Sequence, residues 1–293
     1  MRDVSNWVFI GHGEKSTLEK EELLSPSNKE YLIKYPRESK VDRVNWEDFN
    51  EVIAAKIAKL LEIKTIEAEI ATRNGKRGCL MVHFLKQYNA QHGEPGAPLL
   101  SYQFGETYDS LIKSPLKSKE LFEMGLNLLE EFTYFKLIKK EFLMMNIFDI
   151  LIGNQDRHPF NWQILFTTEE DFFGPLYDNG ASLGWQLPDA TLTNMIKNES
   201  QLNKFFKNTR LKCGLFEHTQ PPIKVADVLS VLISRFPTEI KDICIRLEQF
   251  DNQAYNQYID STPLISDVRK EFLKNFIYFR KHKIIETIRK GDA

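Results

Sequence analysis

The spacing of apolar and polar residues changes near residue 100. Before that point, three short runs rich in β-branched and aromatic residues, WVFIG, EYLIKYP and GCLMVHFL, alternate with turn-forming stretches such as SPSN and RNGKRG. We expect these runs to be strands of an antiparallel sheet. Residues 45–63 instead carry apolar side chains at helical spacing, namely Phe49, Val52, Ile53, Ile57, Leu60 and Leu61. One helix, with Asn45 as its N-cap, should therefore pack on this sheet.

After residue 100 the helical period dominates, first over residues 118–152 and then near residues 190–207, 224–249 and 264–289. Strands are predicted there only around residues 162–166 and 175–177. The predicted fold class is α+β, a two-lobed protein-kinase-like arrangement of a small sheet lobe followed by a larger helical lobe. The predicted divisions are a sheet lobe with one main helix at 1–86, a polar, Gly- and Pro-containing connector at 87–98, and a mostly helical lobe at 99–293.

Composition narrows the class of protein. A chain of 293 residues with 42% hydrophobic content is expected to be a soluble globular protein, and a net charge of −2 gives no global case for nucleic-acid or membrane binding. Cys79, Cys213 and Cys244 are too far apart for a zinc site or a disulfide framework, so a reducing cytoplasm is expected. The N-terminus does not resemble a secretion signal, and two polar residues interrupt the most apolar stretch, at 142–153.

The stretch FDILIGNQDRHPFNWQILF, residues 148–166, places polar residues between an apolar helix and an apolar strand. Asp156 and Asn161 have the spacing D-x-x-x-x-N, and Asp178 follows seventeen residues later in GPLYDNGAS. Phosphoryl transfer needs a carboxylate that orients the attacking hydroxyl, then an amide oxygen and a second carboxylate that hold magnesium. The pattern predicts these roles for Asp156, Asn161 and Asp178 in that order. The alternative is ordinary turn chemistry, in which Asp and Asn are frequent.

A kinase site also needs a cation for the nucleotide phosphates, placed on a strand and fixed by a helix glutamate. Lys34 in YLIKYP has this position, with Glu51 as its expected partner and Glu47 as the alternative one turn earlier. A solvated lysine on the polar face of an edge strand is the other interpretation.

The stretch GHGEKST, residues 11–17, follows the first predicted strand. It is not a Walker A motif, because Glu14 rather than glycine precedes Lys15 and another strand follows. Gly11 and Gly13 match two glycines of G-x-G-x-x-G, with Ser16 in the third position. This could be a simple hairpin turn, but it lies upstream of the lysine strand, where a kinase glycine-rich loop belongs.

With these motifs in view, the chain resembles the HipA-like serine/threonine kinases, bacterial toxin kinases with an atypical protein-kinase fold. The likeness rests on GHGEKST, LIKYP, NEVIAAKIAKLLEI, the stretch at 148–166 and GPLYDNGAS. It implies ATP and Mg²⁺ as cofactors, Asp156 as catalytic base, and Asn161 and Asp178 as metal ligands. It also implies nucleotide contacts by the phosphate loop, the strand lysine with its glutamate and a hinge beside adenine: Gly11, Gly13, Lys15, Lys34, Glu51, Val82, His83 and Phe84. His158 is expected to brace the catalytic loop.

The resemblance further implies a cytoplasmic toxin of a toxin–antitoxin pair that phosphorylates a translation-related protein and has an antitoxin partner. No direct DNA binding and no membrane association are expected. Because the phosphate loop starts at Gly11, the expectation is a short, kinase-core form without the extra N-terminal subdomain of longer HipA proteins. Apolar residues, Val8 to Ile10, stand where the family carries a regulatory serine, so Ser16 and Thr17 are the candidate phosphorylation sites.

Other acceptors remain open. N-x-D-R…N followed by DNG also resembles type II phosphatidylinositol 4-kinases, although no cysteine cluster for palmitoylation is present. A small-molecule kinase is similarly possible, and a non-catalytic pseudokinase is the alternative from another class. The basic C-terminal stretch at 268–290 is expected to be an amphipathic closing helix that packs through Phe272, Phe276 and Phe279. Docking of an anionic partner through Lys281 and Lys283 is its alternative role.

Overall fold

The computed structural model describes residues 1–13, 18–37, 45–217 and 223–291. Within these residues, six strands form the N-terminal sheet: β1 (Arg2–Asp3), β2 (Val8–His12), β3 (Lys20–Leu24), β4 (Glu30–Lys34), β5 (Ala68–Arg73) and β6 (Lys76–Val82). Their order is β1-β5-β6-β4-β3-β2. The three runs predicted as strands are confirmed as β2, β4 and β6. Neighbouring strands are antiparallel, except that β1 pairs with β5 in parallel, which the antiparallel prediction missed.

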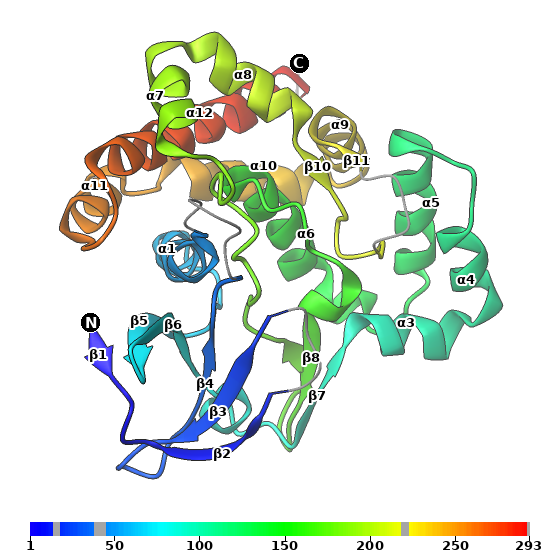
Figure 1. The fold of residues 1–293 in the computed structure, drawn as a ribbon. Coiled ribbons are helices and arrows are strands. Elements are labelled where there is room, and N and C mark those ends of the chain that lie inside the picture. Colours follow the sequence, from blue (N-terminus) through cyan, green and yellow to red (C-terminus); the bar gives the residue numbers. More distant parts are fainter. Residues whose placement is uncertain (14–17, 38–44, 218–222, 292–293) are drawn as a thin grey trace.

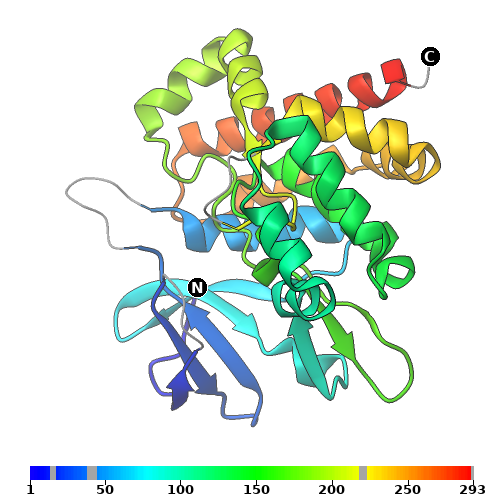
Figure 2. The same ribbon diagram turned by 90° about the vertical axis from the view of Figure 1, so that its right-hand side faces the viewer.

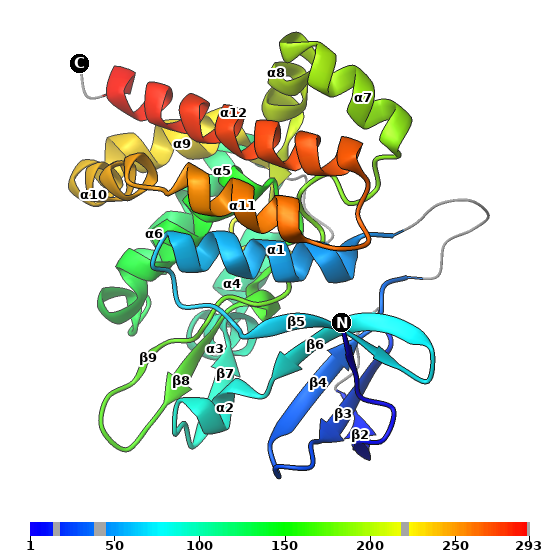
Figure 3. The same ribbon diagram turned by 90° about the vertical axis from the view of Figure 1, so that its left-hand side faces the viewer.

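Helix α1 (Glu47–Leu60) lies between the sheet and the helical part of the molecule, as Figure 3 shows. Its apolar face joins the large core that continues through the helices, so α1 is anchored to both parts. The predicted N-cap is wrong. Trp46 occupies that position without a side-chain cap, because the Asn45 amide donates instead to the Arg37 carbonyl, 2.7 Å away.

The predicted connector at 87–98 contains regular secondary structure. The elements there and nearby are α2 (Phe84–Gln87), β7 (His92–Pro95), α3 (Gly96–Phe104), β8 (Gln163–Phe166) and β9 (Phe172–Phe173). Strand β7 pairs with β8, and β8 with β9, in a small sheet beside the larger one (Figures 1 and 3). The sequence pattern did not predict β7, because Gly and Pro have low strand propensity. The strand predicted around 175–177 is wrong, because only a single bridge, Leu176 to Thr65, forms there.

The remaining described elements are mostly helices, which stand above the sheet in Figures 1 and 2. They are α4 (Glu106–Ile112), α5 (Ser118–Glu130), α6 (Phe135–Ile152), the 3-10 turn η1 (Pro159–Asn161), α7 (Asp189–Lys197), α8 (Glu199–Asn208), β10 (Arg210–Leu211), β11 (Ile223–Lys224), α9 (Val225–Arg235), α10 (Pro237–Glu248), α11 (Asn252–Ser261) and α12 (Asp267–Gly291). The helical periodicity is confirmed, although the stretch at 118–152 is two helices, and α11 was not predicted.

The C-terminal helix α12 closes the helical part. It packs on α7, α6, α9, α10 and α11, and its predicted packing residues Phe272, Phe276 and Phe279 are buried. Lys281 is buried too and donates to Asn252 Oδ1 at 2.9 Å, while Lys283 contacts Glu286. A docking surface that includes Lys281 is therefore excluded.

No helix in the described part of the chain combines the length and the apolar character needed to cross a membrane.

Candidate active site

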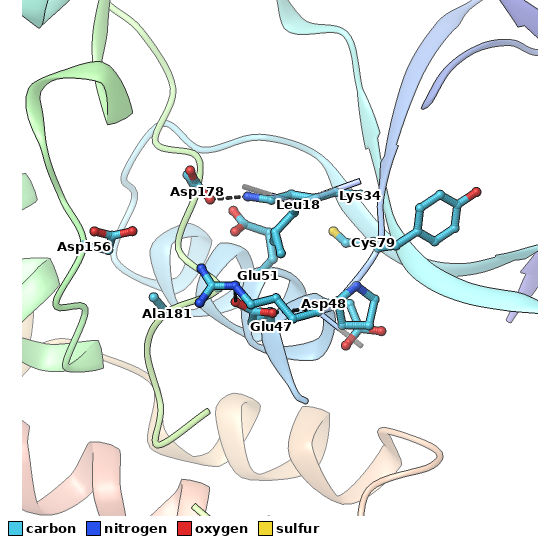
Figure 4. A pocket seen from close by; sticks show the side chains of 13 residues that line it. Leu18, Lys34, Glu47, Asp48, Glu51, Cys79, Asp156, Asp178 and Ala181 are labelled. Atoms are coloured by element: carbon cyan, nitrogen blue, oxygen red, sulfur yellow. Dashed lines mark hydrogen bonds and ion pairs between the residues drawn. The ribbon is translucent and has the colours of Figure 1, made fainter. Parts of the chain in front are cut away.

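A pocket lies where β4, α1 and two loops of the helical part meet. In Figure 4, Lys34 and Asp178 point at each other, and Asp156 lies on the neighbouring loop beyond Asp178. Glu51 also lines the pocket from α1. Lys34 and Asp178 are more than 140 positions apart in the sequence, yet they meet at one site together with Glu51 and Asp156.

The loop after α6 holds Asp156 through its own backbone. The Asp156 amide donates to Asn154 Oδ1 at 3.0 Å, and the Asp156 carbonyl accepts from the His158 amide at 2.8 Å. The Asn161 side chain donates to the same carbonyl at 2.9 Å. The Asp156 carboxylate is left one-third exposed toward the pocket, where it pairs with the Lys212 ammonium. The residues of D-x-x-x-x-N are therefore joined into one turn, and the carboxylate is presented outward.

Arg157 turns inward and joins the loop that carries Asp156 to its surroundings. It is buried and grips Asp149 of α6 with two hydrogen bonds of 3.0 and 3.1 Å. It also donates to the carbonyls of Asn161, at 2.8 Å, and Tyr177, at 2.6 Å, and to Asn179 Oδ1. This single guanidinium thus fixes the distance between the loop that carries Asp156 and the segment that contains Asp178, using the fork of donors that arginine offers.

Lys34 is not a solvated edge lysine. Strand β4 lies inside the sheet between β3 and β6, and the Lys34 side chain is only 15% exposed. Its ammonium forms an ion pair with Asp178. Burial opposes the charged form of Asp178, but the Lys34 ammonium outweighs burial and lowers the pKa of Asp178 below its ordinary value. Both groups are therefore charged at neutral pH.

The predicted direct partnership between Lys34 and Glu51 is not found among the described residues. Glu51 instead accepts hydrogen bonds from Asn179, at 2.6 Å from the backbone amide and 3.2 Å from the side chain. The alternative partner, Glu47, contacts Arg37. Glu51 remains close enough for its charge to act on Lys34, and burial raises the pKa of Glu51 above its ordinary value. Its geometric role is to fix the residue after Asp178.

The glycine of the DNG segment is required by close packing. A Cβ atom on Gly180 would lie 2.9 Å from the Glu47 carbonyl oxygen at the start of α1. Two residues further along, the Ser182 carbonyl accepts from the Asn50 side chain at 2.7 Å. Helix α1 is therefore fastened along the whole segment that follows Asp178.

Asn161 and Asp178 have donor atoms that fit Mg²⁺. The Asn161 amide nitrogen is used by the Asp156 carbonyl, which leaves the amide oxygen for a cation. Asp178 has a left-handed backbone, with φ of +57°, a conformation that Asp tolerates better than most residues and that is common at functional sites. Because protein-bound Mg²⁺ usually takes one or two carboxylates and substrate phosphates, this small donor set suits it.

The glycine-rich stretch begins within β2. Gly11 lies in β2 beside a register shift, and Gly13 comes directly after the strand. Lys15, with Ser16 and Thr17, lies outside the described residues. Leu18, which directly follows this stretch, lines the pocket with Lys34.

The expected hinge is only partly available for a nucleobase. The Val82 amide donates to the Glu67 carbonyl at 3.1 Å, and the His83 amide to the Glu30 carbonyl at 3.0 Å. These two amides are used within the sheet, and the hinge stays a prediction. Phe84 begins α2, and the first amides of a helix have no partner inside it. Its amide is thus the better candidate of the three.

Tyr177 is a site residue that the sequence interpretation missed. Its ring stacks on Phe84, with centroids 5.9 Å apart, and its hydroxyl donates to the Phe160 carbonyl at 2.7 Å. Both rings pack with Leu32 and Met81 in a small apolar cluster next to the pocket. An aromatic residue directly before Asp178 was the available signal. Lys212 also contacts a residue of the site, but no sequence signal marks it, because it lies 56 residues from its partner Asp156.

Comparison with known proteins places the chain in a family. The model of the HipA-like C-terminal domain matches residues 9–257. The chain belongs to this family. The serine/threonine-protein kinase CtkA of Helicobacter pylori is 30% identical over 155 residues, which are 52% of this chain and 46% of CtkA. This alignment spans about half of the curated relative.

Solved structures show the same fold over nearly the whole chain. The crystal structure of the Helicobacter pylori proinflammatory kinase CtkA matches with a TM-score of 0.78 and 23% identity, over 99% of this chain and 97% of that one. HipA of Shewanella oneidensis MR-1, solved with HipB and operator DNA, matches with a TM-score of 0.56 and 14% identity, over 98% of this chain and 67% of that one. The α+β, protein-kinase-like fold class is thereby confirmed.

Proposed function

We propose that this protein is an ATP- and Mg²⁺-dependent serine/threonine protein kinase. The observation that carries the proposal is the pairing of two carboxylates at one pocket, Asp156 on the catalytic loop and Asp178 on the next segment, with Lys34 at Asp178. Catalysis of phosphoryl transfer depends mainly on positioning and on charges of this kind. Family membership supports the same reaction.

In the proposed mechanism, Asp156 accepts a hydrogen bond from the serine or threonine hydroxyl and takes its proton as the oxygen attacks the γ-phosphorus. Lys34 binds phosphate oxygens of ATP, and Asn161 and Asp178 supply oxygen ligands to Mg²⁺. The metal ion, when bound, neutralises charge on the phosphates. Arg157 keeps the catalytic loop and the Asp178 segment in register through the bonds described above.

The apolar cluster beside the pocket is the proposed nucleobase site. Leu32 and Met81 come from the sheet, while Phe84 and Tyr177 provide aromatic faces. A flat heteroaromatic ring gains from stacking on such faces and from one backbone donor for orientation. Phe84 supplies both in this proposal.

We further propose a cytoplasmic toxin role, with a translation-related protein as substrate and an antitoxin protein as partner. Family membership supports it, as does the likeness to HipA of Shewanella oneidensis, whose structure is described as a toxin–antitoxin system with HipB. Induced expression in a bacterial host tests it: growth should stop with the wild type and continue with Asp156→Asn. Growth arrest by both proteins, or by neither, contradicts a kinase-dependent toxin.

The reaction itself is tested with radiolabelled ATP, magnesium and a bacterial lysate, comparing the wild type with Asp156→Asn. We expect labelled protein bands with the wild type alone. Label in the lipid fraction or in small molecules would replace the protein acceptor by one of the alternatives. ATP binding without any transfer would identify a pseudokinase.

A further inference from the structure

Lys212 is a buried cation that neither the sequence motifs nor the family resemblance assigned a role. It follows β10 directly, and its ammonium forms both a hydrogen bond and an ion pair with Asp156 Oδ1. Its side chain is only 12% exposed. Lysine is among the residues least often buried, because desolvation of the ammonium must be offset by a partner. The carboxylate that should orient the acceptor hydroxyl is that partner.

The backbone around Lys212 is fastened to the catalytic loop on two sides. The Gly214 amide donates to the Arg157 carbonyl at 2.7 Å, and the Gly214 carbonyl accepts from Trp162 Nε1 at 2.7 Å. Cys213 and Gly214 both have left-handed backbones, with φ of +57° and +70°. The left-handed backbone at Gly214 favours glycine, because other side chains are strained in that conformation. The position of Lys212 is therefore built into the fold.

The other cations at or near the pocket have partners of their own, and Arg37, which lines it, is paired with Glu47. Lys34 is paired with Asp178, on the side proposed for the nucleotide phosphates. Arg157 neighbours Asp156 in the chain, but its guanidinium is buried among Asp149, Asn179 and backbone carbonyls and faces away from the pocket. Among the described residues, the ammonium paired with Asp156 is that of Lys212.

We propose that Lys212 is a further catalytic residue, the cation that meets the transferring phosphoryl group on the acceptor side. This inference rests on the proposed kinase function. A hydroxyl bonded to Asp156 lies about 3 Å from the carboxylate, and its oxygen about 3 to 3.5 Å from the reacting phosphorus. An ammonium seated on the same carboxylate is thus within reach of the equatorial phosphoryl oxygens.

The chemical step balances without any further reactant. The acceptor oxygen forms a bond to the γ-phosphorus, and the bond from that phosphorus to the β–γ bridging oxygen breaks, with its electron pair leaving on ADP. The acceptor proton passes to Asp156. Lys212 stays protonated throughout and stabilises negative charge on the phosphoryl oxygens, as preorganised cations do in phosphoryl transfer. In the resting protein the same ammonium holds the Asp156 carboxylate in place.

A purely structural lysine would behave differently from a catalytic one. Loss of a brace would lower the melting temperature and affect every ligand, whereas loss of a catalytic cation should lower kcat and leave ATP affinity intact. The fold should tolerate a neutral side chain at 212, because Asp156 is one-third exposed and would regain water. This allows the two roles to be separated.

The test compares Lys212→Met, Lys212→Ala and Lys212→Arg with the wild type, Asp156→Asn and a matched control, Lys224→Ala. Lys224 lies in the paired strand β11, opposite Arg210, and is exposed. The measurements are the rate of ADP release, labelling of lysate protein, ATP affinity by calorimetry and the melting temperature.

We expect Lys212→Met and Lys212→Ala to lower kcat by roughly 10²- to 10³-fold, the usual cost of losing one preorganised electrostatic group. ATP affinity should be retained, Lys212→Arg should recover part of kcat, and added ethylamine should partly rescue Lys212→Ala. Lys224→Ala should match the wild type. The arginine variant and the amine rescue keep the test informative if a neutral variant folds poorly.

Three results would overturn the inference. The first is wild-type kcat in Lys212→Met while Asp156→Asn is inactive, which removes the role of Lys212 alone. The second is a loss confined to ATP affinity and melting temperature, with no rescue by ethylamine or arginine, which marks a brace. The third is a wild type that neither releases ADP nor labels any acceptor, because the kinase proposal then fails and takes this role with it.

Discussion

The two sides of the pocket are built in different ways. On the nucleotide side, Lys34 from the sheet meets Asp178 from the helical part, and α1 fastens the segment after Asp178 through Glu51 and Asn50. On the acceptor side, Asp156 and Lys212 both belong to the helical part. The nucleotide side therefore depends on how the sheet and α1 are placed. The acceptor side depends only on the loop that carries Asp156 and on the turn after β10.

This difference predicts a separation of effects. Substitutions on the nucleotide side should weaken ATP binding, and those on the acceptor side should slow transfer without weakening it. Arg157 is the exception, because it contacts the catalytic loop and the Asp178 segment together. Variants of these residues test whether the two sides act separately.

Arg157→Ala should have the largest effect, because it disturbs both sides. Removing one partner of the buried pair leaves the Asp149 carboxylate unpaired and should cost about 3 to 5 kcal/mol of unfolding free energy. Urea unfolding measures this cost, and transfer activity should be lost with it. The matched control is Arg235→Ala, which breaks a more exposed two-bond pair with Glu130 and should cost less than about 1 kcal/mol. Equal costs for the two variants would contradict the role given to Arg157.

Asp178→Asn should weaken magnesium-dependent ATP binding by at least roughly 10- to 100-fold. Mutating a residue that only supports a metal ligand already has an effect of this size. Asparagine also tolerates a left-handed backbone, so the turn should survive the change. Calorimetric titration of ATP with and without magnesium measures the change in binding. Binding that stays equally responsive to magnesium would exclude Asp178 as a ligand.

Glu51→Gln should have a smaller effect on the same side. The two carboxylate oxygens of Glu51 each accept one hydrogen bond from Asn179, and a glutamine has only one oxygen to do so. The change also removes a negative charge near Lys34. Loss of one charge-assisted hydrogen bond corresponds to roughly a 10-fold increase in KM for ATP. Initial-rate kinetics measure this change, with exposed Glu62→Gln at the end of α1 as control. A change in kcat alone would contradict the assignment of Glu51 to the nucleotide side.

The pH dependence of stability should change least. Because Lys34 lowers the pKa of Asp178 in the folded protein, this carboxylate adds stability above its unfolded pKa of about 4, and the contribution disappears as pH falls through the folded value. Asp178→Asn should therefore lose less stability than the wild type on acidification below about pH 4. Urea unfolding at several pH values measures the two slopes, and parallel slopes would mean that the ion pair does not persist in solution.

Local patterns predicted most of the elements around the site. Alternating apolar runs marked β2, β4 and β6, and helical spacing marked α1, α6 and α12. Strand β3, with the sequence KEELL, was missed because three of its five residues are charged and its pairing on both sides outweighs low strand propensity. In the same way β7, which contains Gly and Pro, is a strand only because β8 lies beside it.

In the candidate site, too, local features could be predicted and long-range contacts could not. The spacing of Asp156 and Asn161 is local, so the sequence could show it. Contacts between distant segments could not be read from spacing, and here the partner of Lys34 proved to be Asp178, while Glu51 serves Asn179. Lys212 illustrates the limit most clearly, because only the turn held against Trp162 brings it to Asp156.

Calorimetric titration of Mg²⁺·ATP into the wild type and Asp156→Asn, combined with labelled-phosphate transfer by the same samples, tests whether this pocket is a kinase active site. We predict equal ATP affinity for the two proteins and a loss of transfer by about 10²- to 10⁴-fold in Asp156→Asn, the usual cost of removing a positioned acid–base group. Transfer at the wild-type rate by Asp156→Asn would contradict the assignment of this pocket as a kinase active site.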